Sequence, residues 1–179
     1  MPILRLPSAA FLRECFSYNR RTGILRWKPR PRRHFRTYKG WAVWNANNAG
    51  RRAGNIKASG HRRVRINSVS FEEHRVVWKM IVLAEPRQTI DHIDGNPSNN
   101  RLNNLRSASD RQQKWNAKLR LDNRSGFRGV HPTGNRWLAR IASNGEYRHL
   151  GCFATKAEAS AAYETVARKL HGEFYRRQK

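Results

Sequence analysis

The chain has 179 residues, enough for one domain or two small ones with modest cores. It carries 37 Lys and Arg against 12 Asp and Glu, a net charge of +25, with Arg mixed among Trp, Tyr and Phe. No apolar run approaches the ~18 residues of a membrane span, and Cys15 and Cys152 lie too far apart for a Cys-x-x-Cys zinc site or a disulfide framework. These features exclude a membrane protein and predict a cytoplasmic chain whose partner is nucleic acid.

The first 60 residues predict a basic N-terminal extension, because they hold 14 basic side chains and 1 acidic side chain. Leu6-Pro7-Ser8 predicts the start of a short helix, and Ile24–Trp27 predicts a strand. The stretch from 28 to 36 has two prolines and five cations, which predict a loop or arm. We expect this loop to contact phosphates through Arg30, Arg32 and Arg33, with a solvated loop as the simpler alternative.

Residues 61 to 120 begin with a predicted strand and helix. Apolar and basic residues alternate in Arg62–Ile66, which is typical of a half-buried strand with a basic outer face. Ser70-Phe71-Glu72-Glu73 has the sequence of a capping box and predicts a helix that runs to about Leu83. His74 falls on the apolar face of that helix, so we expect a packed core histidine rather than a ligand.

The most informative stretch runs from Thr89 to Asn116. Residues 89–93 predict a strand, 94–97 predict a turn, and an Asn-rich loop leads to a helix that begins within 107–110 and runs to Lys118. Asp91 and His92 are neighbours, so in a regular strand their side chains would point to opposite faces. We therefore expect a twist or bulge at the strand end that brings both to one site.

This stretch resembles the HNH endonucleases, the ββα-metal or His-Me finger family, and in particular their phage-type homing and free-standing members. The resemblance lies in Asp91-His92, the turn, Asn104 within Asn-Asn-Leu-Arg, and the following helix. It implies that His92 is the general base, that Asn104 orients its imidazole, and that Asp91 binds a single divalent metal, Mg²⁺ first and Mn²⁺ as the alternative. Phosphodiester hydrolysis independently requires such groups, a base near neutral pH and a cation beside the phosphate.

One position departs from the family pattern. Its third motif residue, normally His or Asn, falls here on Gln113. Gln offers an amide oxygen as Asn does, but its extra methylene moves that oxygen outward. We expect Gln113 to complete the metal site, with Asn116 one turn later as the competing ligand.

Residues 121 to 179 predict a second domain. Residues 128–130, 136–141 and 147–150 predict three antiparallel strands, and Thr155-Lys156-Ala157-Glu158 predicts a capping box that opens a helix ending near Gly172. The unit resembles the Apetala/ethylene-response-factor DNA-binding domain through Arg-Gly-Val at 128–130, Trp-x-Ala-x-Ile at 137–141, Leu-Gly-x-Phe at 150–153 and the Ala-rich helix. In that family the exposed sheet face enters the major groove. The expected DNA contacts are Arg128, Arg136, Arg140, Tyr147 and His149.

The sequence thus predicts an α+β protein with a basic extension (1–60), a ββα-metal HNH core (61–120) and a three-stranded antiparallel sheet packed on one helix (121–179). The expected activity is metal-dependent cleavage of double-stranded DNA by a monomer or weak dimer, with no small-molecule cofactor. If the chain is phage-encoded, it would act in the host cytoplasm. The alternative is a non-catalytic DNA-binding or regulatory protein on a decayed nuclease fold, which Gln113 favours. Target site and nicking against double-strand cleavage stay open.

Overall fold

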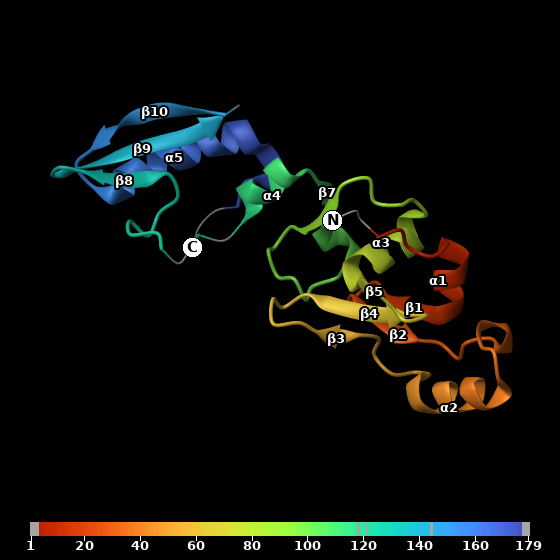
Figure 1. Cartoon of the computed structure of the whole chain (residues 1–179). Helices are drawn as coiled ribbons and strands as arrows, with labels where there is room; N and C mark the ends of the chain where they lie inside the picture. Colours follow the sequence, from red (N-terminus) through yellow and green to blue (C-terminus); the bar gives the residue numbers. More distant parts are fainter. Residues whose placement is uncertain (1–3, 118, 121, 144, 177–179) are drawn as a thin grey trace. The chain divides into compact units, whose positions relative to one another are not determined.

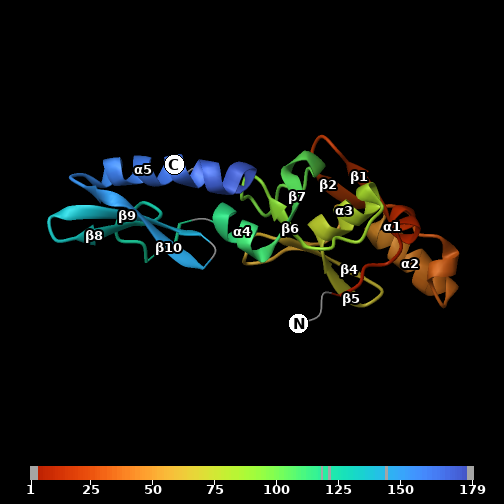
Figure 2. The same ribbon diagram turned by 90° about the horizontal axis from the view of Figure 1, so that it is seen from above.

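The computed structural model describes residues 4–117, 119–120, 122–143 and 145–176, and it divides the chain into two compact units, 1–108 and 109–179. The elements of each unit are labelled in Figure 1, and Figure 2 shows them after a 90° turn. Five α-helices and small antiparallel sheets fill the described part of the chain, so the α+β class is confirmed. None of the described helices is long and apolar enough to cross a membrane.

The first unit combines three helices with three antiparallel groups of strands. The helices are α1 (Ala9–Cys15), α2 (Tyr38–Asn48) and α3 (Glu73–Val82), and short 3₁₀ turns cover Arg32–His34 and Leu102–Asn104. The strand groups are β1 (Phe16–Asn19) with β2 (Ile24–Trp27), β3 (Asn55–Ile56) with β4 (Arg62–Ile66) and β5 (Val69–Glu72), and β6 (Thr89–His92) with β7 (Leu105–Ala108). The predicted strands at 24–27 and 62–66 are confirmed.

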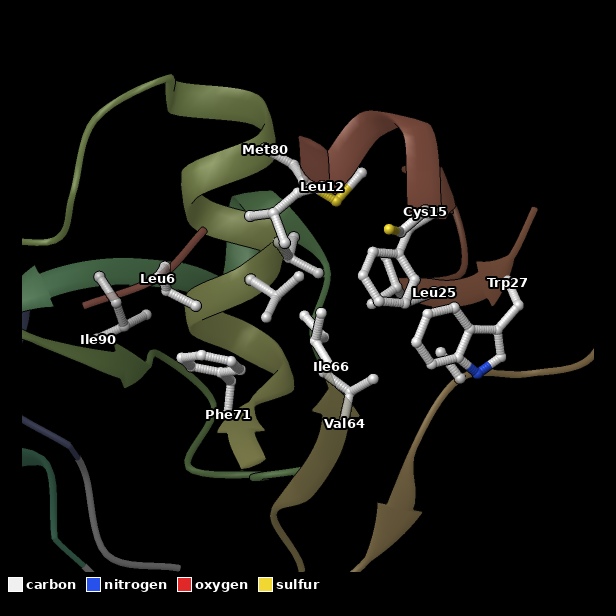
Figure 3. Close-up of a cluster of buried hydrophobic side chains, with 14 of the residues drawn as sticks. Leu6, Leu12, Cys15, Leu25, Trp27, Val64, Ile66, Phe71, Met80 and Ile90 are labelled. Carbon is white, nitrogen blue, oxygen red and sulfur yellow. The ribbon is translucent and has the colours of Figure 1, made fainter. Parts of the chain in front are cut away.

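One hydrophobic core joins these elements. In Figure 3, Leu12 and Cys15 of α1 lie in the same cluster as Leu25 of β2, Val64 of β4 and Met80 of α3. The core therefore takes side chains from both sides of residue 60. The boundary expected there between an extension and a nuclease core does not separate compact units in the structure, because the two segments bury their apolar faces against each other.

The helix expected to open at Ser70 begins three residues later. Residues 69–72 form strand β5, in which Phe71 lies opposite Val64 of β4 and is buried. The residue before α3 is Glu72, whose side chain makes no capping hydrogen bond. The capping-box prediction is wrong because pairing with β4 buries Phe71 and satisfies this backbone in a sheet ladder.

The proline- and arginine-rich stretch is ordered around Arg30, which corrects the expectation of an open loop. Only 5% of Arg30 is exposed. Its guanidinium lies 4.9 Å from the ring of Phe35 and 5.1 Å from that of Trp44, and it donates to Oδ1 of Asn67 (2.9 Å). Helix α2, which the sequence did not predict, supplies Trp44, and the side chain of Thr37 caps its N-terminus.

Arg32 and Arg33 differ from Arg30 in that both side chains stay at the surface. Arg32 donates to the carbonyl oxygens of Phe35 and Arg36, and Arg33 pairs with Glu14 at 2.5 Å. These contacts stabilise the 3₁₀ turn, so the stretch holds more regular structure than the loop that its prolines predict.

The second unit matches its predicted elements closely. It contains α4 (Asp110–Asn116), β8 (Val130–Thr133), β9 (Arg136–Ser143), β10 (Glu146–Phe153), α5 (Lys156–His171) and a 3₁₀ turn (Gly172–Phe174). The sheet order is β10–β9–β8, and Ala139 and Ile141 of β9 turn inward to the face covered by α5. Thr155 and Glu158 form the expected capping box. The strands expected at 136–141 and 147–150 and the helix are confirmed, whereas the strand expected at 128–130 lies further along the chain, at Val130–Thr133.

We expect Leu12→Ala to lower the free energy of unfolding by about 2–5 kcal/mol, because it opens a cavity where the side chain is completely buried. Urea unfolding followed by tryptophan fluorescence measures the loss. Val82→Ala is the matched control, since Val82 is 43% exposed at the end of α3 and its truncation should change stability by less than about 0.5 kcal/mol. Equal losses in the two variants would contradict the place of α1 in the core.

Candidate active site

Asp91 and His92 lie on strand β6, which pairs with β7 without a shift of register. Asp91 lies opposite Arg106, and His92 lies opposite Leu105. Side chains alternate along a regular strand, and burial alternates here too, since half-buried Asp91 precedes buried His92. The expected bulge is therefore wrong: pairing stays regular through His92, and the two side chains belong to opposite faces of the hairpin.

A series of buried polar groups holds the imidazole of His92. Its Nε2 lies 2.9 Å from Oδ1 of Asn100, whose Nδ2 donates to Oε1 of Glu73 (3.2 Å). The other carboxylate oxygen of Glu73 accepts from Nε of Arg62 (3.0 Å). Glu73 is 0% exposed and Asn100 1% exposed, so these hydrogen bonds form in a region of low dielectric, where they are strong.

The direction of these hydrogen bonds fixes which ring nitrogen carries the proton. The carboxylate of Glu73 accepts only, so the amide of Asn100 turns its Nδ2 to Glu73 and its Oδ1 to His92. Because Oδ1 is also an acceptor, Nε2 of neutral His92 holds the hydrogen. Nδ1 then keeps its lone pair, which is the form that a general base requires. Burial raises the pKa of Glu73, an effect that Asn100 and Arg62 partly offset.

The β1–β2 hairpin positions the loop that carries Asn100. The hydroxyl of Tyr18 donates to the carbonyl oxygen of Asn100 (2.9 Å) and accepts from the amide of Leu102 (2.9 Å). The turn of the hairpin comes very close to this loop at Gly23, where a Cβ would lie 2.6 Å from the amide nitrogen of Arg101. Gly23 has a φ of +73°, which also favours glycine. The N-terminal segment is thus part of the scaffold of the site.

Asn104 has other partners than the imidazole expected for it. Its Nδ2 donates to Oδ1 of Asp94 (2.9 Å) and to the carbonyl oxygen of Asn99 (2.8 Å), and its Oδ1 accepts from the amide of Asp94 (3.0 Å). These bonds close the turn after β6. Asn100 makes the hydrogen bond to Nε2 of His92 that the sequence assigned to Asn104, because the 3₁₀ turn directs Asn104 back to its own loop.

Asp91 is held by an ion pair across the hairpin. Nε and Nη2 of Arg106 donate to Oδ2 of Asp91 at 3.1 and 3.0 Å, and both side chains are largely buried. This pair orients a carboxylate, a donor that hard divalent cations prefer. Among the described residues, no three His, Cys, Asp or Glu side chains are grouped to hold a metal ion. The donors fit a site of one carboxylate with amide, water and phosphate oxygens, rather than a closed zinc site.

Gln113 and Asn116 lie on α4, in the second unit. Ser109 and Gln112 form a capping box at the start of this helix, which begins within the expected range of 107–110. The helix ends at Asn116, and the expected end at Lys118 lies outside the described residues. Gln113 is half-buried and Asn116 is buried, and both carry an amide oxygen that a hard cation accepts.

Two further histidines surround His92. The ring of His74 lies 5.1 Å from that of His92, and the ring of His61 lies 5.8 Å from each of the other two. His74 is buried on α3, as expected for a packed histidine. Burial lowers the pKa of His74 to about 3, and the neighbouring His92 and His61 add to this effect. Burial also lowers the pKa of His61. His74 and His61 therefore favour the neutral form.

Arg128 caps a helix rather than facing the outer surface of the sheet, which corrects its assignment as a DNA contact. Its guanidinium donates to the carbonyl oxygens of Trp115 (2.6 Å) and Ala117 at the C-terminal end of α4. The last carbonyls of a helix have no partners inside it and attract a cation. The prediction is wrong because β8 begins only at Val130, so strand alternation does not extend to Arg128.

The outer face of the second unit's sheet brings together the four other expected DNA contacts. His149 of β10 lies opposite Arg140 of β9, and the guanidinium of Arg140 lies 4.6 Å from the ring of Tyr147, which is 70% exposed. Arg136 of β9 is exposed and donates to the carbonyl oxygen of Cys152 (2.8 Å). The result is a basic and aromatic face opposite the one that α5 covers.

Three residues contact the site although the sequence analysis assigned them no role in it: Glu73, Asn100 and Arg106. Arg106 could have been found from the sequence, because residues of opposite charge favour directly opposed positions in an antiparallel hairpin and Arg106 lies opposite Asp91. Glu73 stands in the first turn of a helix, where acidic residues are common on the surface. Asn100 is one of several asparagines in its loop, and spacing does not distinguish it.

His74 predicts a pH dependence of stability. Burial lowers the pKa of His74 from its ordinary value of 6.5 to about 3, so between these values the unfolded chain binds a proton that the folded chain does not. The contribution of His74 to the free energy of unfolding is therefore unchanged above pH 6.5 and falls by ~1.4 kcal/mol for each unit that the pH decreases below it. We expect His74→Leu to remove this slope in urea unfolding between pH 6 and 4.5. Parallel pH curves for the two proteins would refute it.

Comparison with known proteins agrees with the site. A model of the HNH endonuclease family matches residues 73–114. Protein 3.8 of Escherichia phage T7 is 36% identical over 106 residues, which cover 58% of this chain and 87% of that protein. The uncharacterized HNH endonuclease L560 of Acanthamoeba polyphaga mimivirus is 32% identical over 103 residues, 56% of this chain and 54% of that protein. No solved structure matches with significance. The chain thus contains an HNH endonuclease domain at residues 73–114 and belongs to the same family as protein 3.8 of phage T7.

Proposed function

We propose that this chain is a metal-dependent DNA endonuclease in which His92 is the general base. Family membership supports a nuclease. The observation that carries the proposal is the buried imidazole of His92, whose Nε2 is held by Asn100, which is itself held by Glu73. A buried carboxylate is costly unless hydrogen bonds satisfy it. Here the bonds that satisfy Glu73 also orient the base.

In the proposed step, Nδ1 of His92 takes a proton from a water molecule as its oxygen attacks phosphorus. The new P–O bond forms, the bond to the 3′ oxygen breaks, and solvent protonates the leaving oxygen. The proton on Nε2 of His92 stays hydrogen-bonded to Oδ1 of Asn100 during this step. Glu73 therefore stabilises the imidazolium through Asn100. Asn104 contributes by closing the turn that follows His92.

HNH nucleases generally use a divalent metal, and we assign its binding to Asp91 and Gln113, with Asn116 as the alternative to Gln113. Oxygen donors suit Mg²⁺, with Mn²⁺ as the second choice. When bound, the metal would polarise the scissile phosphate and stabilise the leaving 3′ oxygen. Arg106 orients the carboxylate of Asp91 through two hydrogen bonds to Oδ2.

We assign recognition of double-stranded DNA to the second unit, as an Apetala/ethylene-response-factor-like module. A three-stranded sheet fits the major groove. Its outer face carries the proposed contacts Arg136, Arg140, Tyr147 and His149. Arg32 and Arg33 are further proposed phosphate contacts on the first unit. We further propose a monomer or weak dimer, which with one site per chain would nick DNA and would need no small-molecule cofactor. It would act in the host cytoplasm as a homing or free-standing phage-type enzyme.

Conversion of supercoiled plasmid tests the nuclease assignment. We expect open circles from the wild type with Mg²⁺ or Mn²⁺ and none with EDTA. His92→Ala should slow the reaction by about 10²–10⁴-fold, because a general base contributes that much. Asn100→Ala should lose part of the same rate, whereas Asn103→Ala, an exposed neighbour in the same loop, should cut like the wild type. Gln113→Asn should cut faster, since it shortens the proposed ligand.

A non-catalytic DNA-binding protein is the second candidate function, and Gln113 in place of the family's His or Asn favours it. The same plasmid experiment distinguishes this candidate from a nuclease. A wild type that retards the plasmid on a gel with every metal but never breaks it would replace the nuclease assignment with this one.

Binding by the second unit's sheet predicts a change in salt dependence. We expect Arg136→Ala with Arg140→Ala to reduce the slope of log K against log salt by ~0.9 for each phosphate that the variant no longer neutralises. Fluorescence anisotropy of a labelled duplex in EDTA measures it. Arg168→Ala is the control, because Arg168 is exposed on α5 and pairs with Glu164. An equal change of the salt slope in Arg168→Ala would contradict the assignment of the sheet to the DNA interface.

A further inference from the structure

The first unit contains a groove that the site at His92 does not use. It has a volume of about 760 Å³ and is lined by residues from β2, the 3₁₀ turn and its neighbour Phe35, α2, and the β3–β4–β5 sheet with its flanking loops. Four exposed cationic side chains line it: Arg52, Lys57, Arg63 and Arg65. Neutral hydrogen-bonding side chains stand between them, including Asn48, Asn67 and Ser70. None of the described lining residues is acidic.

Strand alternation places the basic residues on this surface. In β4, Val64 and Ile66 point into the hydrophobic core, so Arg63 and Arg65 point outward. Ser70 of β5 lies directly opposite Arg65. The same five-residue strand therefore supplies both a wall of the core and a row of cations.

A buried cation lies at the floor of the groove. Arg30 is 5% exposed and lines the groove beside Phe35 and Trp44, and its hydrogen bonds go to neutral groups, Oδ1 of Asn67 (2.9 Å) and Nδ1 of His34 (3.3 Å). Among the described residues no carboxylate pairs directly with Arg30, and Glu14 reaches it only through His34, whose Nε2 lies 2.7 Å from Oε2 of Glu14. A buried charge without a counter-charge is unfavourable. An anion in the groove would supply that counter-charge.

The surrounding charges leave the groove strongly positive. Glu72 stands at its edge and pairs with both Lys57 (3.2 Å) and Arg63 (2.8 Å). Arg30, Arg52, Lys57, Arg63 and Arg65 give +5, and Glu72 gives −1, so a net charge of +4 remains. The cations are spread along a sheet face rather than gathered at one point, which suits several phosphates in series better than a single small anion.

We propose that this groove binds the sugar–phosphate backbone of a DNA strand, as an anchoring surface separate from the second unit's sheet. The inference rests on the proposed function for the identity of the polymer, though not on cleavage. Arginine and neutral Asn and Ser side chains are the groups that commonly contact phosphate oxygens, and they carry no sequence information. The groove would therefore add affinity and leave base preference to the other unit.

The test uses the full chain and a labelled duplex in EDTA, so that no strand is cut. We expect Arg52→Ala with Arg65→Ala to lower the slope of log K against log salt by ~1.8, because each of the two arginines neutralises one phosphate, at ~0.9 each. Arg20→Ala with Arg87→Ala removes the same charge from exposed positions outside the groove lining and should leave the slope unchanged. Equal slopes for the two double variants would overturn the proposal.

A second variant guards against an indirect effect of removing arginines. Ser70→Glu places a negative charge opposite Arg65 at an exposed position and deletes no cation. It should weaken duplex binding at least tenfold at low salt and keep the melting temperature of the wild type. Full affinity in Ser70→Glu would contradict a phosphate backbone in the groove.

Inorganic phosphate separates a polymer from a small anion. Trp27 and Trp44 line the groove, so the part of the fluorescence change that Trp44→Phe removes reports occupation of the groove. We expect the duplex to change this fluorescence at micromolar concentration and phosphate only at far higher concentration. Tight, saturable phosphate binding that the duplex does not displace would overturn the proposal. If the groove variants change the salt slope as expected but the wild type does not cut plasmid, the result would contradict the nuclease function and not the groove.

Discussion

The carboxylate of Glu73 is the group on which the polar interior of the first unit depends. One of its oxygens holds Asn100, and through it the imidazole of His92, while the other holds Arg62. Arg62 in turn donates to the carbonyl oxygens of Ala53 and Gly54, at 3.2 and 2.7 Å. Helix α3, the small sheet and the Asn-rich loop thus meet at one buried acid. Its removal would leave the charge of Arg62 uncompensated in the interior, so fold stability and the orientation of the His92 imidazole are physically linked.

Regular pairing in the β6–β7 hairpin separates two chemical tasks that stand next to each other in the sequence. Asp91 faces one side, where Arg106 orients it, and His92 faces the other, where Asn100 orients it. Each side chain therefore has its own positioning group. A single strand can carry the proposed cation-binding carboxylate and the proposed base without a direct hydrogen bond between them, because alternation keeps the two side chains apart.

The large positive charge of the chain serves two physical purposes. Arg30, Arg62 and Arg128 are internal parts: one fills an aromatic cage, one pairs with a buried carboxylate, and one caps α4. The planar guanidinium, with five donors, suits all three roles better than an ammonium group would. The cations at the outer sheet face and in the groove stay available for a polyanion. Net charge alone did not distinguish the internal arginines from the external ones.

The sequence by itself determined much of the local structure. Strand alternation at 62–66, the strand that carries Asp91 and His92, and the helix starts at Ser8 and Thr155 follow from interactions between residues close in the chain, and each is confirmed. Only the tertiary structure decided the partners: Asn100 rather than Asn104 at the imidazole, Arg30 in a cage completed by α2, and one core spanning residue 60. The reason is distance along the chain. Asn100 meets Glu73 from 27 residues away and Tyr18 from 82, and no short-range pattern encodes such contacts.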